Sequence, residues 1–458
     1  NRDPYIFKTA DFGKTWKRIN SDLPKHELSY VRTITDDPNC PGLLFAGTGN
    51  GLYYSLDEGG HWTPLQTGLP AAPVTWAVVQ PRFHDLVVST YGRGLYILDD
   101  ITPLEQMAKH RSDAGVVLFE PRAAYRFVRG PVGLLNFSLK TKPSSALKFE
   151  ILDSQGKLVR QLEAKVEDLV VGINRVKWDM RYDSPRVIAL RTVAPDNSHI
   201  WDEPRFRDAD SRPITHWGSK PGEVGPIVAP GTYSVRLKVD GQSYTQPLMV
   251  LPDPHAPGSA ADIDLSVKTL LKIRDDISSV SDTVNHMEWL RKQIEVIETM
   301  LRPGKKPDQS KAPPAEADDE DDAEPAAAPP RALIEAQEQQ KKQLLAAAEE
   351  LDKKLQGVES RLVSRALRNS DDKYFIEPYG AYLDLIWLNA EVGTGGGDVA
   401  GSADFAPTET QLGLLKSYEA EAASVDSDYR KILQNDLPLF DRALESANLA
   451  PLVGGARN

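Results

Sequence analysis

Residues 9–16 read TADFGKTW, and residues 55–62 read SLDEGGHW. Both stretches follow the pattern Ser/Thr-x-Asp-x-Gly-x-x-Trp, and the two copies lie 46 residues apart. A second pair of similar stretches, LFAGTGNGLY at 44–53 and VVSTYGRGLY at 87–96, lies 43 residues apart. These spacings match the length of one four-stranded β-propeller blade. The first hundred residues or so are therefore predicted to form about two and a half blades, an incomplete propeller.

The aspartate and glycine of the first pattern suit a hairpin turn. An Asp side chain can accept backbone N–H groups across the turn, and Gly readily adopts a positive φ. The tryptophan is then expected to pack between adjacent sheets. The residues with this predicted structural role are Asp11, Gly13, Trp16, Asp57, Gly59 and Trp62. The functional alternative is a calcium or sugar site at the two aspartates.

This pattern resembles the Asp-box, or BNR repeat, of large bacterial sialidase-like and sortilin-like propeller proteins. Residues 86–104, LVVSTYGRGLYILDDITPL, resemble the closing strands of such a propeller. The resemblance covers essentially the whole chain and implies an extracytoplasmic protein that is periplasmic, secreted or at the cell surface. A closed propeller needs at least about four blades. The rest of the propeller, from upstream sequence or a second chain, is therefore the first expected partner.

The composition argues against several classes of partner and site. The formal net charge is -12, but seven acids fall between Glu316 and Glu324, and the remainder of the chain has no basic stripe. Nucleic acid is therefore not expected to bind. No apolar stretch reaches about 18 residues, so no transmembrane segment is expected. Cys40 is the one cysteine, which rules out an intrachain disulfide.

Short alternating apolar runs separated by turns predict a β-sandwich, immunoglobulin- or fibronectin-like, over 116–254. A long insertion at 183–229 interrupts it. The insertion carries His199, Trp201, Arg205, His216 and Trp217. Loops of this length are uncommon without a role, and aromatic side chains beside Arg and His could line a carbohydrate or peptide site. The alternative is that the tryptophans pack against the sandwich or the propeller and hold the loop in place.

The apolar spacing becomes helical from 260 to 448 and predicts a helical bundle. Stripes at 263–301 and 344–362 predict two long helices that pack as an antiparallel hairpin. The acidic Pro- and Ala-rich linker at 303–330 between them is expected to be disordered. Thr408 and Gln411 form a capping-box pattern that begins a third long helix.

No catalytic constellation, metal-ligand cluster or cofactor motif is recognisable in the sequence. The glycine-rich stretch at 47–51 continues as a strand, which argues against a dinucleotide site. The predicted function is therefore a non-catalytic exported binding or scaffolding protein. One alternative is a sialidase- or xyloglucanase-like glycoside hydrolase, whose catalytic residues would lie upstream of this chain. The other is a subunit of a cell-surface or membrane-associated complex.

Overall fold

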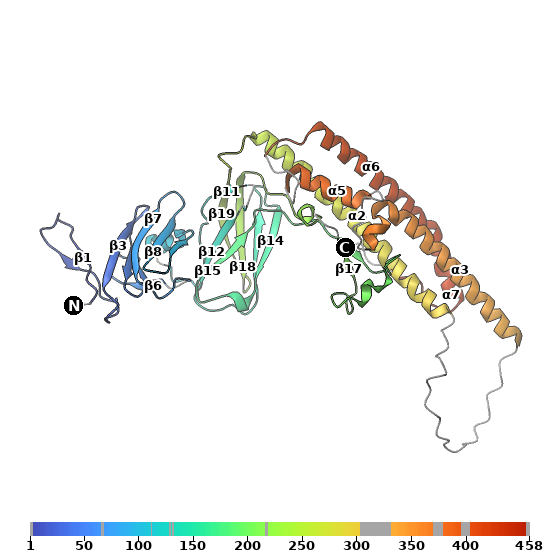
Figure 1. Ribbon diagram of the computed structural model, residues 1–458, viewed down its shortest axis with the longest axis horizontal. Coiled ribbons are helices and arrows are strands. Elements are labelled where there is room, and N and C mark those ends of the chain that lie inside the picture. Colours follow the sequence, from blue (N-terminus) through green and yellow to red (C-terminus); the bar gives the residue numbers. More distant parts are fainter. Residues whose placement is uncertain are drawn as a thin grey trace, which may run out of the picture. The chain divides into compact units, whose positions relative to one another are not determined.

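The computed structural model describes residues 3–65, 68–110, 112–127, 130, 132–215, 219–302, 331–369, 379–394 and 404–454. The chain divides into two compact units, Asn1–Asp183 with Ile227–Ala256 and Ser184–Pro226 with Pro257–Asn458. The first unit contains several β-sheets, and the second is largely helical with long helices (Figure 1). No helix in the described part of the chain is long and apolar enough to cross a membrane. The predicted linker at 303–330 lies outside the described residues.

The first unit begins with three antiparallel sheets. The first two are a ribbon of β1 (Phe7–Lys8) and β2 (Lys17–Arg18), and a sheet of β3 (Val31–Asp37), β4 (Cys40–Thr48), β5 (Leu52–Ser55) and β6 (Thr63–Leu65). The third sheet contains β7 (Val74–Gln80), β8 (Asp85–Thr90) and β9 (Leu95–Leu98). Within each sheet the strands follow chain order, as in a meander.

The β3–β6 sheet is covered on both faces. Successive side chains of a strand point to opposite faces, and both Phe45 and Ala46 of β4 are buried. Phe45 shares a core with the β7–β9 sheet, whereas Ala46 packs with Ile6 and Ile19 of the N-terminal segment. The sheets therefore pack face to face as successive layers of one unit.

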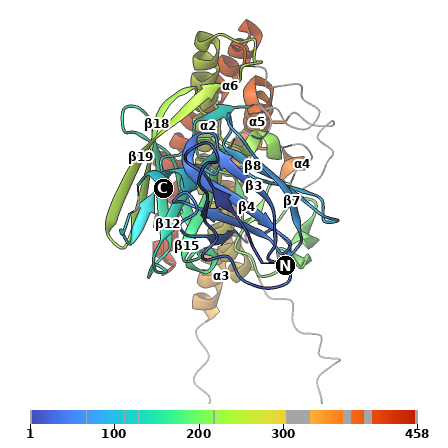
Figure 2. The ribbon, with the colours of Figure 1, turned by 90° about the vertical axis from the view of Figure 1, so that its left-hand side faces the viewer.

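Two further sheets enclose the second core of this unit. They have the strand orders β10-β12-β15 and β11-β19-β18-β13-β14. The bounds are β10 (Val116–Leu118), β11 (Ala124–Arg126), β12 (Gly133–Leu139), β13 (Leu147–Leu152), β14 (Leu158–Ala164), β15 (Gly172–Trp178), β18 (Gly231–Val239) and β19 (Gln242–Pro252). β18 and β19 form the longest hairpin (Figure 2). Phe137, Phe149 and Trp178 are fully buried between the sheets.

A buried polar joint connects the β7–β9 sheet to these sheets. Asp100, which follows β9, accepts hydrogen bonds from Thr102 Oγ1 at 2.6 Å and from Asn136 Nδ2 of β12 at 2.7 Å. Arg175 of β15 donates to Asn136 Oδ1 at 2.8 Å and to the carbonyl of Asp99 at 2.7 Å. Because these polar groups satisfy one another, the contact is specific although it is buried. The short helix α1 (Thr102–Lys109) begins directly after this joint.

The second unit is built on long helices. The long helices are α2 (Ala260–Leu301), α3 (Arg331–Leu362) and α6 (Glu409–Lys431), and shorter ones are α4 (Arg365–Arg368), α5 (Ala381–Asn389) and α7 (Leu437–Ser446). A wide helical turn at Ile432–Asp436 joins α6 to α7. The predicted capping box of Thr408 and Gln411 is confirmed, and Ser259 with Asp262 forms another at the start of α2. The predicted apolar stripe of α2 faces the shared core of this unit, with Ile273, Ile277 and Met287 among its fully buried residues.

The insertion belongs to the helical unit. It contains the short strands β16 (Ala189–Leu190) and β17 (Arg212–Pro213). Its expected packing against the sandwich or the propeller differs from the structure, in which residues 184–226 group with the helices. Apolar and polar contacts both hold it there. Ile188, Leu190 and Ile214 lie in the core of the helical unit, and buried Glu288 of α2 accepts hydrogen bonds from the backbone N–H of Thr192 at 2.8 Å and from its hydroxyl at 2.7 Å. A buried carboxylate requires such donors.

Candidate functional site

The two repeated turns use their aspartates internally. Asp11 accepts a hydrogen bond from the backbone N–H of Thr15, and Asp57 accepts one from that of His61, both at 2.8 Å. The Thr15 backbone and hydroxyl groups also lower the pKa of Asp11. Gly13 and Gly59 occupy the same place in each turn, with φ values of 89° and 88°. The carboxylate oxygens of both aspartates thus accept hydrogen bonds from the backbone of their own turns.

The two repeat tryptophans have different environments. Trp62 is 5% exposed, donates to the carbonyl of Ile19 at 2.6 Å and packs in the core that holds Ile6 and Leu23. Trp16 is 61% exposed and donates only locally, to the carbonyl of Gly13 at 3.2 Å. The expectation that Trp16 packs between sheets is therefore wrong for the described chain. Burial of the indole depends on a neighbouring layer, which covers Trp62 and leaves Trp16 in solvent.

The candidate ligand residues of the insertion that the structure describes each contact other residues of the insertion. Trp201 packs on the small cluster of Ala194, Ile200 and Phe206, and its indole N–H donates to the carbonyl of Thr192 at 3.3 Å. The exposed His199 faces the carboxylate of Asp202. Arg205 stacks over the ring of Phe206, 4.5 Å from its centroid. His216 and Trp217 lie outside the described residues, so a ligand site here stays a prediction.

A buried acidic cluster lies between the sheets and α1. Asp37, at the end of β3, is 2% exposed, and its Oδ1 accepts the backbone N–H of Asn39 at 2.8 Å. Buried Glu105 of α1 lies 2.6 Å from Nδ1 of His84. Burial, with added repulsion from Glu105, raises the pKa of Asp37 to about 6. Perturbed carboxylates often mark active sites. Here the contacts of Glu105 with His84 and with the thiol of Cys40 connect α1 to the two sheets.

We expect Asp37→Asn to stabilise the protein at neutral pH. The folded state holds a proton on Asp37 that the unfolded chain releases above about pH 4, so stability falls as pH rises from about 4 to about 6. The amide keeps the Oδ1 acceptor and removes the charge, which should raise the free energy of unfolding at pH 7 by about 1–2 kcal/mol. Urea titrations between pH 4 and 8 measure this. Exposed Asp36→Asn is the control, and a less stable Asp37→Asn protein at pH 8 would contradict the assignment.

The main candidate site is the outer face of the β7–β9 sheet. This surface, named here the outer face, comprises Trp76, Val78, Val87, Leu95 and Ile97. The strand register aligns Val78 with Val87 and Val87 with Ile97, while Trp76 and Leu95 flank Ser89 in the neighbouring row. Trp76 is 67% exposed and Leu95 is 75% exposed. An apolar patch of this kind marks a docking surface.

The sequence contains a signal for this face. β7 reads VTWAVVQ, and it places Ala77 and Val79 in the core while Trp76 and Val78 project outward. A strand that is apolar on both sides is typical of a sheet covered on both sides. The β3–β6 sheet meets that condition, whereas the described residues cover the β7–β9 sheet on its inner face alone.

Comparisons with known proteins add little to this geometry. No family model and no curated protein matches the chain. One solved structure, the extracellular domain of a putative hybrid two-component system from B. thetaiotaomicron, aligns with 10% identity and a TM-score of 0.16. The alignment covers 54% of this chain and 28% of that structure. No functional argument follows from a likeness of this size. In the described part of the chain, no group of three His, Cys, Asp or Glu residues is placed to hold a metal ion.

Proposed function

We propose that this chain is a non-catalytic, exported binding or scaffolding protein that docks through its β-sheets. In this proposal residues 1–104 are blades of a BNR-type propeller, 116–254 are an immunoglobulin- or fibronectin-like sandwich, and 260–448 are a helical bundle. The 46-residue repeat, the meander order of the sheets and their face-to-face packing support the blade assignment.

One observation carries the proposal, namely the apolar outer face. The opposite face of the same sheet packs on the β3–β6 sheet through Val79 and Val88, which meet Phe45 and Leu52. The natural occupant of the outer face is therefore another sheet of the same repeat, since a matching layer would bury Trp76 and the rows beside it. At ~25 cal/mol per Å2, burying several such side chains would stabilise the contact by several kcal/mol.

Site-specific photo-crosslinking in the producing cell tests the occupant. Benzoylphenylalanine at position 76 should form a cross-link to a β-strand segment near a Ser/Thr-x-Asp-x-Gly-x-x-Trp motif, in the same polypeptide or in a companion chain. The matched control is the same group at position 439, where Leu439 is exposed on α7 of the helical unit. The cross-linked peptide is identified by mass spectrometry.

Two outcomes would overturn the proposal. A position-76 protein that forms no cross-link, or links only to segments without this repeat, would remove the blade-docking role. If the cross-linked assembly hydrolysed a glycan and lost that activity when a carboxylate of the partner blades was substituted, the hydrolase alternative would replace the non-catalytic assignment.

A further inference from the structure

A cavity in the first unit lies between the β1–β2 ribbon and the turn of the second repeat. Its volume is about 630 Å3, within the range of about 300–1,000 Å3 typical of ligand pockets. On the ribbon side its lining includes Lys8, Trp16, Lys17 and Arg18, and on the other side it includes residues 57–60. Residues from both repeats therefore line one cavity.

The two acidic residues of this lining already have partners. Glu58 contacts the ammonium group of Lys8, and this contact lowers the pKa of Glu58. Asp57 accepts hydrogen bonds from the hydroxyl of Ser55 at 2.9 Å and from the backbone N–H of His61 at 2.8 Å. Both carboxylates are thus occupied by groups of the protein itself.

Among the described residues, two cations of the lining have no counter-ion. Lys17 lies directly opposite Lys8 in the strand register, and like charges at directly opposed positions repel. Glu58 neutralises Lys8 but does not contact Lys17. In the described part of the chain, neither Lys17 nor Arg18 forms an ion pair or a side-chain hydrogen bond. An anionic group bound by both side chains would remove this repulsion.

The indole of Trp16 provides an apolar surface beside these cations. Its N–H donates to the carbonyl of Gly13 at 3.2 Å, which holds the polar edge of the ring against its own turn although the residue is largely exposed. Ala10 and Ile19 extend the apolar part of the lining. Ligand pockets commonly combine aromatic and apolar side chains with a small number of polar groups. This cavity has that composition.

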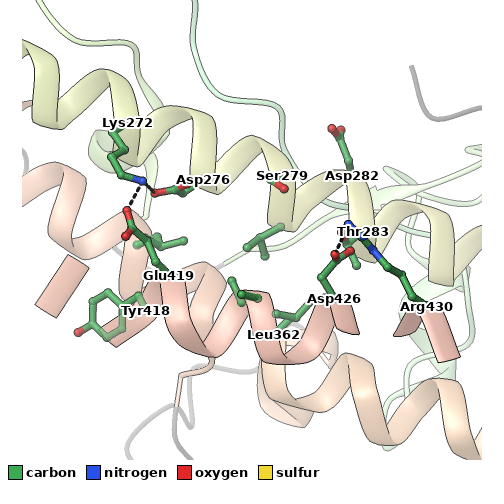
Figure 3. Close-up of a pocket in the computed structure, with 14 residues that line it drawn as sticks. Lys272, Asp276, Ser279, Asp282, Thr283, Leu362, Tyr418, Glu419, Asp426 and Arg430 are labelled. Carbon is green, nitrogen blue, oxygen red and sulfur yellow. Dashed lines mark ion pairs between the residues drawn. The ribbon is translucent and has the colours of Figure 1, made fainter. Parts of the chain in front are cut away.

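A groove in the helical unit, between α2 and α6, differs in its charges (Figure 3). Lys272 contacts the carboxylates of both Asp276 and Glu419. Asp426 pairs with Arg430 at 2.6 Å. Both cations that line the groove are therefore already neutralised, whereas the cavity in the first unit has cations available for a ligand.

We propose that the cavity in the first unit binds a small carboxylate that carries a ring, with the ring stacked on Trp16 and the carboxylate held by Lys17 and Arg18. The lining has three cations and two carboxylates, so one further negative charge balances it. A guanidinium presents paired N–H donors that match a carboxylate, and an ammonium adds a point charge. An aromatic ring and a sugar ring both have a face that can stack on an indole. This inference goes beyond the proposed function, which concerns the outer face and a protein partner.

Isothermal titration calorimetry of the full chain tests the cavity with two ring carboxylates, naphthoate and methyl glucuronoside. At least one should bind saturably, and more weakly as salt is raised. The one that binds more tightly identifies the ring as aromatic or sugar. The methyl ester of that acid lacks the charge and should not bind. Absence of saturable binding by both acids, or equal binding of acid and ester, would overturn the proposal.

Two pairs of variants locate the binding site. Lys17→Glu should weaken binding about tenfold, because it removes a charge-assisted hydrogen bond, whereas Lys14→Glu makes the same charge change outside the lining and should have little effect. Trp16→Ala should weaken binding about fivefold through lost stacking. Phe12→Ala, which removes an exposed ring of the same turn outside the lining, should not. Equal effects within either pair would place the ligand elsewhere and refute the assignment.

Discussion

Arg291→Met is expected to destabilise the helical unit by about 3–5 kcal/mol, because it removes the cation that contacts two buried carboxylates and leaves Glu359, among the described residues, only the more distant Arg368, at 3.7 Å. Arg291 of α2 contacts Glu359 at 2.6 Å, Glu288 at 3.0 Å and Asp352 at 2.8 Å. The side chains of Glu288 and Glu359 are fully buried. A methionine of similar length restores none of this charge. Urea unfolding followed by helical circular dichroism measures the loss.

Two control variants separate the network from general effects. Lys292→Met removes the neighbouring, partly exposed cation that pairs with Glu295 at 3.1 Å, and it should cost at most about 1 kcal/mol. Glu359→Gln removes a group whose pKa is raised to about 7, chiefly by burial. Its folded state keeps a proton that the unfolded state loses, so stability falls as pH rises from about 4.5 to about 7. Glu359→Gln should flatten this fall. Equal losses from Arg291→Met and Lys292→Met would contradict the network.

Gly59→Ala is expected to cost about 2–4 kcal/mol, and Gly13→Ala only about 1–2 kcal/mol, although both occupy the same position of the repeat. The two glycines have nearly equal positive φ values, 88° and 89°, so the backbone strain of an alanine is the same. An added Cβ at Gly59 would lie 2.6 Å from the side chain of Ile19, whereas the nearest atom to one at Gly13 is 3.9 Å away, on Trp16.

The larger effect at Gly59 has a structural cause. Buried Ile19 packs with Trp62 and its carbonyl accepts the Trp62 indole N–H, so a displaced Ile19 also disturbs that contact. Thermal unfolding of both variants by calorimetry provides the comparison, and the difference between them isolates the packing contribution. If both substitutions lowered the free energy of unfolding equally, backbone strain alone would account for the loss. The close approach to Ile19 would then not contribute to stability.

Local patterns predicted much of the secondary structure. Apolar residues at every third or fourth position predicted a long helix over 263–301, and α2 runs Ala260–Leu301 because that stripe faces a shared core. The capping-box pattern of Thr408 and Gln411 predicted the start of a long helix, and α6 begins at Glu409. These features depend on residues close in sequence, so they can be read without knowing the fold.

From local patterns alone, the order of β-sheets before long helices, the repeated turns and the capping box at Thr408 could therefore be predicted. The tertiary structure alone decided which equal motifs are buried, since Trp16 and Trp62 share one local pattern but only Trp62 meets a neighbouring layer. It also placed the insertion on the helices and brought Arg291 to Glu359, 68 residues along the chain. Burial and charge pairing depend on groups that are distant in sequence, and no local period encodes which of them will meet.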